Sequence, residues 1–239
     1  MKRFIKLIIL IIISLSVYFI YNCKTDSKIN YVSLGDGFAV GLNSYQANSY
    51  GYNAYIRDYL KKNNLLNNYN FSFAYEDMMI NDLKKDILIN VHDEENNNIR
   101  QVLRQANLLT ISVGINDLIY QKEINYSLTE LNIDRVLTKI VDNLNDTLKE
   151  VRKYYQGKIY LVGYYNFYPQ NSVERKLLNE LNNNYQQLNG KNNIIFIDNS
   201  NLNTNLSNYL ENPNSFYPNT AGYSQIFNNI LKNLIIEKQ

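Results

Sequence analysis

Few residues in this chain can support nucleophilic chemistry. Covalent catalysis pairs a nucleophile with a base whose pKa lies near neutrality, and the chain has one histidine, His92, and one cysteine, Cys23. His92 follows a predicted helix, 79–89, that runs from a strand back toward the opposite edge of the sheet, so we expect it in a loop away from any site. No cofactor is expected. The Cys/His spacing of a zinc site is missing from the sequence, and the acidic run at 93–95 lacks a spaced calcium-binding pattern.

Apolar runs alternate with segments of helical spacing over most of the sequence. The predicted strands are 31–34, 68–74, 108–113, 158–162 and 194–197, and the predicted helices are 50–61, 79–89, 128–156, 173–188 and 220–236. This alternation indicates a parallel sheet covered on both faces, in one α/β domain. Because open parallel sheets place their sites outside the carboxyl ends of the strands, the loops after Leu34, Ala74, Val113 and Val162 and the segment before the last helix are the candidates.

Four motifs in these loops resemble those of the SGNH/GDSL hydrolase family. Residues 32–37 (VSLGDG) are similar to the strand and turn that carry its Gly-Asp-Ser motif, and residues 113–117 (VGIND) to its Gly-x-Asn-Asp motif. Residues 217–223 (YPNTAGY) match the segment His-Pro-Asn-x-x-Gly-Tyr in all but the first residue, and residues 163–166 (GYYN) resemble a turn of bacterial members. The resemblance covers about residues 30–236. It implies a three-layer α/β/α, flavodoxin-like fold with a parallel sheet of about five strands, and a serine esterase or acyl hydrolase.

The resemblance also implies which residues would form the catalytic triad, and all three are replaced. The serine position is Gly37, the histidine position is Tyr217, and the aspartate position is Asn214. Tyrosine, with an ordinary pKa of about 10, is a poor base. Loss of either serine or histidine costs a well-studied serine protease roughly 10⁶-fold in turnover. Among the other serines Ser215 lies closest to the site, but no histidine is expected beside it.

The oxyanion-binding groups implied by the family are partly retained. The asparagine is present as Asn116, whereas the glycine after the second strand best matches Asp77, and no glycine lies between Gly51 and Gly114. A carboxylate close to a developing anion would repel it by up to about 4 kcal/mol at an effective dielectric constant of about 20. We therefore expect no intact catalytic site at Gly37, Asp77, Asn116, Asn214 and Tyr217.

The same loops are rich in tyrosine, which offers an apolar face and a hydrogen-bonding tip suited to sugar or peptide contacts. An equally good interpretation is that tyrosine replaces other large residues in a chain without tryptophan. The retained acids Asp36 and Asp117 are expected to order the turns, as the resemblance implies, and not to form a new acid–base pair. The predicted ligand-binding residues are Asp36, Asn116, Tyr164, Tyr165 and Tyr217.

The first 23 residues resemble a secretory signal or membrane anchor. Lys2, Arg3 and Lys6 precede an apolar run of about 15 residues, 7–21, which is short beside the roughly 20 of a spanning helix. The basic residues predict a cytoplasmic N-terminus and an exported domain. Cys23 is either a lipidated cysteine, although residues 21 and 22 depart from the lipoprotein pattern, or a bystander thiol. We predict an anchor at 1–23, a linker at 24–30 and the domain at 31–239.

Three functions remain open from the sequence. The first is an inactive pseudo-esterase that binds a glycan, lipid or protein at the cell envelope, and the second is an active esterase with a relocated nucleophile such as Ser215. The third is a structural or scaffolding envelope protein whose working surface lies away from the cleft. The formal net charge of +2 gives no sign of a nucleic-acid partner.

Overall fold

The sheet is parallel throughout. The computed structural model describes residues 28–124, 133–212 and 215–234, and Ile29–Leu234 form one unit. Its strands lie in the order β2-β1-β3-β4-β5, which is the flavodoxin-like order. The prediction of an α/β fold with a sheet of about five parallel strands is confirmed. The strands are β1 (Ile29–Gly35), β2 (Leu66–Asn70), β3 (Leu108–Ser112), β4 (Ile159–Val162) and β5 (Ile194–Ile197).

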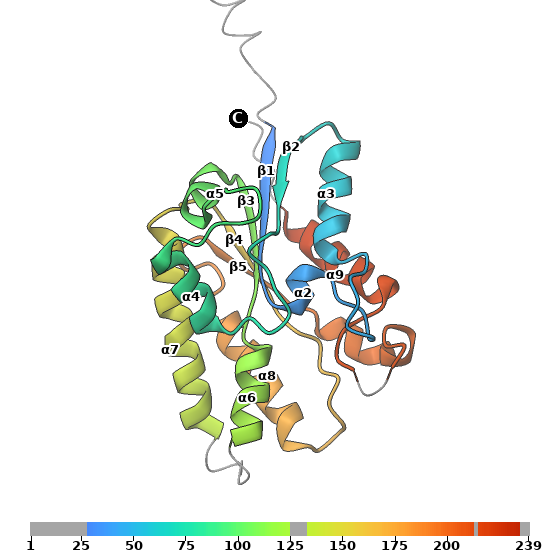
Figure 1. Cartoon of the computed structure of the whole chain (residues 1–239). Coiled ribbons are helices and arrows are strands. Elements are labelled where there is room, and N and C mark those ends of the chain that lie inside the picture. The colour runs from blue at the N-terminus through green and yellow to red at the C-terminus, as the bar shows by residue number, and fades with distance from the viewer. Residues whose placement is uncertain (1–27, 125–132, 213–214, 235–239) are drawn as a thin grey trace, which may run out of the picture. The chain divides into compact units, whose positions relative to one another are not determined.

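Helices cover both faces of this sheet (Figure 1). On one face α3 (Tyr52–Lys62) packs against α9 (Thr220–Asn233). On the other, α7 (Ile133–Arg152) packs between α4 (Ile80–Ile89) and α8 (Val173–Gln186). Because both faces are covered, every residue of β3 and of β4 is buried.

Four short elements were not predicted, and one strand ends early. The additional elements are α2 (Gly37–Val40), α5 (Ile99–Gln105), α6 (Ile115–Ile124) and the 3₁₀ segment η2 (Ser200–Asn208). The predicted strand 68–74 ends at Asn70, since Ala74 donates its N–H back to the Phe71 carbonyl (3.0 Å) and makes only an isolated bridge with Gly35. This strand lies at the edge of the sheet and is half exposed, so its apolar pattern is weak.

Several predictions lie outside the described residues. These are the anchor at 1–23, with Cys23, the start of the predicted helix 128–156, and Asn214. In the described parts of the chain no helix is both long enough and apolar enough to cross a membrane.

The ends of β1 and β3 approach one another closely. Gly35 has φ +128°, a conformation that favours glycine, and a Cβ placed there would overlap the Ser112 backbone carbonyl. The Asp36 N–H donates to the same carbonyl at 2.8 Å. The turns that follow β1 and β3 are therefore held together at the carboxyl edge of the sheet, where the strands end.

One face of α7 is an apolar stripe, and the helix buries this face. Its buried residues recur at three- and four-residue steps and include Leu137, Ile140, Leu144, Leu148 and Val151. α7 packs against α4 in the helical layer on that side of the sheet. The stripe is what a helix needs in order to be stabilised by tertiary packing.

We expect Leu144→Ala to lower the free energy of unfolding by about 2–5 kcal/mol, because it removes a fully buried side chain and leaves a cavity. The exposed Lys139 on the same helix provides the control, and Lys139→Ala should change stability by less than about 0.5 kcal/mol. Urea unfolding followed by circular dichroism measures both. Equal effects of the two substitutions would contradict the packing described for α7.

Candidate active site

Asp36 organises the first turn of the site. Its Oδ1 accepts the Phe38 N–H at 3.1 Å, which caps α2, and its Oδ2 accepts the Tyr164 hydroxyl at 2.5 Å. The carboxyl group is fully buried, and this burial raises the pKa of Asp36 to about 7, although both hydrogen bonds act in the opposite direction. Asp36 thus joins the loops after β1 and β4.

Asp117 has a similar role in the next turn. Its Oδ2 accepts the N–H of Ile80 at 3.0 Å, at the start of α4. Burial raises the pKa of Asp117 to about 6. The geometry gives each of these acids a turn-ordering role.

Tyr217 occupies the space that a side chain at position 37 would need. A Cβ built on Gly37 would lie 2.5 Å from both Cε1 and Cζ of the Tyr217 ring. The ring is only 2% exposed and contacts Phe38, with ring centroids 5.5 Å apart. Its backbone is fixed as well, since the Ser44 hydroxyl donates to the Tyr217 carbonyl at 2.8 Å. Tyr217 therefore fills the space beside position 37, where the resemblance predicts a nucleophile, and its ring is buried.

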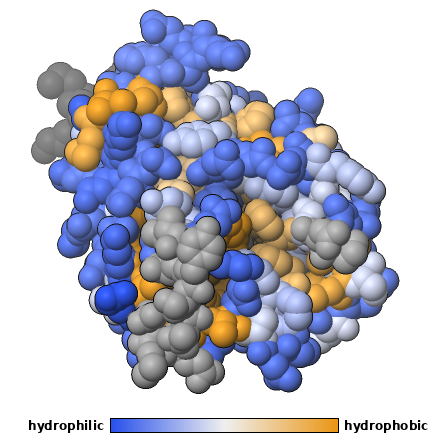
Figure 2. Space-filling model, turned by 60° about the horizontal axis from the view of Figure 1, so that its bottom comes forward, coloured by the Kyte–Doolittle hydropathy of each residue, from blue (hydrophilic) through white to orange (hydrophobic). Residues whose placement is uncertain are grey.

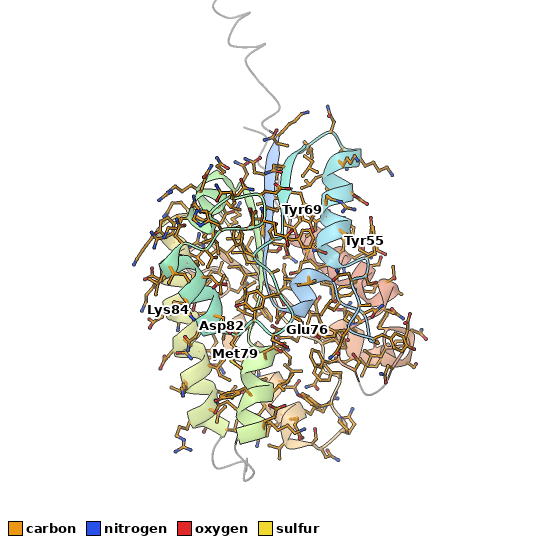
Figure 3. All side chains as sticks on the ribbon, in the orientation of Figure 1. Tyr55, Tyr69, Glu76, Met79, Asp82 and Lys84 are labelled. Atoms are coloured by element: carbon orange, nitrogen blue, oxygen red, sulfur yellow. The ribbon has the colours of Figure 1, made fainter. Side chains whose placement is uncertain are left out.

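The two groups expected to bind an oxyanion converge on an atom of the chain itself. The Gly37 N–H donates to the Glu76 carbonyl oxygen at 3.3 Å, and the Asn116 Nδ2 donates to the same oxygen at 2.8 Å. Asn116 Nδ2 also donates to the Met78 carbonyl at 3.1 Å. Figure 3 shows Glu76 between α2 and the beginning of α6, the elements that carry these donors. A main-chain carbonyl thus occupies the position that the family resemblance predicts for a substrate oxygen.

A β-turn orients this carbonyl. The Met78 N–H donates to the Tyr75 carbonyl at 3.2 Å, so the Glu76–Asp77 peptide is the central peptide of the turn. Every described peptide is trans, and a trans peptide directs its C=O and N–H oppositely, so the Asp77 N–H points away from the oxyanion position. Turning the peptide over would require φ > 0 at position 77, which favours glycine. Asp77 does not have a positive φ.

The backbone around position 77 also affects the site. Repulsion of an anion by the exposed Asp77 carboxylate stays a prediction, and burial, with the charge of Asp77 as a smaller contribution, raises the pKa of Tyr217. The hydrogen bonds of Gly37 and Asn116 to the neighbouring Glu76 carbonyl were not predicted from the sequence. The sequence did contain a signal for this turn: residues 76 and 77 are both acids, and no glycine stands where the family has a glycine.

The structure brings the predicted ligand-binding residues together, but most are inaccessible. Asp36, Tyr164, Tyr165 and Tyr217 are at most 2% exposed, and only Asn116 is half-buried. The Tyr165 hydroxyl donates to the Phe216 carbonyl at 2.5 Å. The expected cleft rimmed by these tyrosines is filled by their own packing. Figure 2, which brings the carboxyl edge forward, shows apolar residues toward the middle of this face with polar residues around them.

The alternative groups do not assemble a second site. His92 is exposed in the loop between α4 and α5, where it forms an isolated bridge with Asn98. Ser215 is half-buried, and its Oγ accepts the N–H of Tyr217 at 3.2 Å. The remaining serines near the site are buried, namely Ser33, Ser44 and Ser112.

A parallel α/β domain with turns of this kind defines the class of GDSL-type hydrolase folds. The sequence profile of the GDSL-like lipase/acylhydrolase family matches residues 33–225. The chain therefore belongs to that family, and the predicted SGNH/GDSL resemblance is confirmed. A comparison with curated proteins finds no match.

Solved structures with this fold are lipases and esterases. A lipase from a goat rumen metagenome has a TM-score of 0.68 at 17% identity, with 87% of this chain and 99% of that chain covered. A mutant of an acetyl-xylooligosaccharide esterase from Geobacillus stearothermophilus has a TM-score of 0.63 at 18% identity, covering 87% and 94%. Phospholipase A1 from Streptomyces albidoflavus gives 0.58 at 15% identity, covering 85% and 98%. At these identities the likeness concerns the fold alone.

We expect Asp36→Asn to alter how stability depends on pH. Because the folded pKa of about 7 lies above the ordinary value of 3.8, the wild type binds this proton more tightly when folded. That contribution is complete below pH 4 and is lost as the pH rises through 7, with a ceiling on the order of 4 kcal/mol. The stability of Asp36→Asn relative to wild type should therefore increase from pH 4 to 7. Urea unfolding across this range measures it, and parallel profiles would contradict it.

We expect Gly37→Ala to lower the free energy of unfolding by about 1–3 kcal/mol, because its methyl group would overlap the Tyr217 ring. In a Tyr217→Ala background the same change should cost much less, since the ring has gone. A double-mutant cycle by urea unfolding measures this coupling. Additive effects would show that the two positions do not compete for one space.

Proposed function

We propose that this chain is a catalytically inactive member of the GDSL-like family, retained for binding at the outer face of the cell membrane. The observation that carries the proposal is the Glu76 carbonyl, which accepts hydrogen bonds from both Gly37 and Asn116. Hydrolysis of an ester requires these donors for the developing oxyanion. With a main-chain oxygen between them, they have no position left for a substrate carbonyl.

The nucleophile and the base support the same conclusion. Position 37 has no side chain, and Tyr217 stands at the position of the base. Burial raises the pKa of Tyr217 well above its usual value, further from the neutral range that a general base needs. A relocated nucleophile at Ser215 is less favoured, because its Oγ already accepts a backbone hydrogen bond and His92, the sole histidine, is exposed in the loop between α4 and α5.

The location is proposed from the first 23 residues, whose basic start and apolar run are typical of an export signal or anchor. The ligand, whether a glycan, a lipid or a partner protein, would meet the surface of the domain. The filled cleft favours contacts outside the old catalytic pocket, because four of the five expected ligand-binding residues are buried.

A fluorophosphonate probe, with mass-spectrometric mapping of modified serines, tests the absence of catalysis. We expect the full-length wild type to remain unlabelled and to leave p-nitrophenyl acetate unhydrolysed above the background rate. The variant Gly37→Ser/Tyr217→His/Asn214→Asp should remain slow, because the Glu76 carbonyl still closes the oxyanion position. Adding Asp77→Gly should raise its rate by about 10²–10³-fold, the usual worth of one oxyanion donor.

These variants also separate the possible failures. A labelled Ser215 in the wild type would establish the relocated-nucleophile alternative and overturn the proposal. Equal rates with and without Asp77→Gly would show that the turn does not close the site. Circular dichroism of each variant ensures that loss of folding is not mistaken for loss of activity.

A further inference from the structure

Basic residues gather at the amino edge of the sheet, where the strands begin. The helices that precede β2, β3 and β4 run antiparallel to the strands, so each of them ends at this edge (Figure 1). Their last turns and the loops that follow contain Lys61, Lys62, Arg104, Arg152, Lys153 and Lys158, and Lys191 precedes β5. Most of these are exposed.

The segments that lead directly into β2, β3, β4 and β5 contain no acidic residue, whereas the segment before β1 contains Asp26 together with Lys24 and Lys28. Residues 61–65, 104–107, 151–158 and 187–193 contain no aspartate or glutamate. The nearest acid along the chain is Glu150, which pairs with Lys153 at 2.6 Å. A positive charge at a helix C-terminus is favoured by the helix dipole, but Lys158 and Lys191 lie in loops, so the dipole does not account for the whole set.

The carboxyl edge has the opposite character. The loops at 36–51, 71–79, 113–117, 163–172 and 198–219 contain no lysine or arginine. They do contain acids, of which Glu76, Asp77, Asp198 and Glu211 are at least partly exposed, whereas Asp36 and Asp117 are buried. The loops at the two edges of the sheet thus differ in charge, which favours one orientation in the field of a charged surface.

The proposed anchor would join the domain at the basic edge. β1 begins at Ile29, so any membrane-embedded segment ending near residue 21 connects to this edge. The residues between, 22–28, can span at most about 24 Å when fully extended. An anchored domain would thus keep its amino edge close to the bilayer.

We infer that the amino edge of the sheet docks on an anionic lipid bilayer, with the acidic carboxyl edge turned away from it. The inference rests on the proposed membrane anchor and adds an orientation to it. A lysine near an anionic surface strengthens binding about fivefold, so several together fix the orientation of a tethered domain. The attraction is electrostatic, and salt screens it.

The chain has no tryptophan, which allows a clean reporter of this orientation. Full-length protein is reconstituted into phosphatidylglycerol or phosphatidylcholine vesicles that contain brominated lipid. One variant contains Gln105→Trp, an exposed position beside Arg104, and the control contains Tyr45→Trp, which is 69% exposed at the carboxyl edge. We expect the fluorescence of the Gln105→Trp variant to be quenched more in phosphatidylglycerol than in phosphatidylcholine vesicles, and that of the Tyr45→Trp variant to be quenched in neither.

Charge variants test the cause. Removing three exposed basic residues at the amino edge should weaken docking by about 100-fold and abolish the additional quenching. Salt at roughly 0.5 M, which screens such contacts, should have the same effect. A matched set removes three exposed basic residues elsewhere and should leave the quenching unchanged. The two sets are Lys61→Gln/Lys62→Gln/Lys191→Gln and Lys85→Gln/Arg135→Gln/Lys139→Gln.

The outcomes separate the inference from the anchor on which it rests. Protein that floats with both kinds of vesicle but shows equal quenching at both positions overturns the docking and leaves the anchor intact. Protein that floats only with phosphatidylglycerol vesicles, in a salt-sensitive way, supports the docking and overturns the anchor. Failure to float with either overturns both.

Discussion

Two preorganised hydrogen-bond donors at the carboxyl edge must be satisfied whatever this domain does. The end of β1 fixes the Gly37 N–H, and the start of α6 fixes the Asn116 amide. The buried Gly37 N–H in particular needs an acceptor, because a buried donor without a partner costs about 1–3 kcal/mol. The Glu76 carbonyl supplies that acceptor, so the turn at 75–78 is tied to both elements. A substrate carbonyl would have to displace an acceptor that is already bound to both donors.

The same edge is filled by aromatic side chains that pack against one another. Tyr217 takes the space that Gly37 leaves. The centroid of its ring lies 4.4 Å from the ring centroid of Phe216 and 5.5 Å from that of Phe38. Buried aromatic side chains contribute large apolar areas to a core, and paired rings add to this. The hydroxyls of Tyr164 and Tyr165 remain satisfied, by Asp36 and by the Phe216 carbonyl. The former pocket is part of the core.

The features that were predicted best from the sequence are those that depend on the regular spacing of apolar residues. The strand at 194–197 and the helix starting at 173 were placed correctly, whereas α2 and α5, at 4 and 7 residues, are too short to show a period. The motifs located the turns of the site, but a motif does not show which way a peptide plane faces. For that reason the role of Glu76 was missed. The basic edge was also missed, since it is assembled from segments far apart in the sequence.

Three features of this site oppose hydrolysis in the proposed interpretation. Position 37 offers no side-chain atom, the Tyr217 ring occupies the adjacent space, and the Glu76 carbonyl accepts hydrogen bonds from both Gly37 and Asn116. Because these features differ in kind, a variant that removes one of them should keep a low rate while the others persist. The buried carboxyl groups of Asp36 and Asp117 hold the turns around them, and they do so through hydrogen bonds that need no bound substrate.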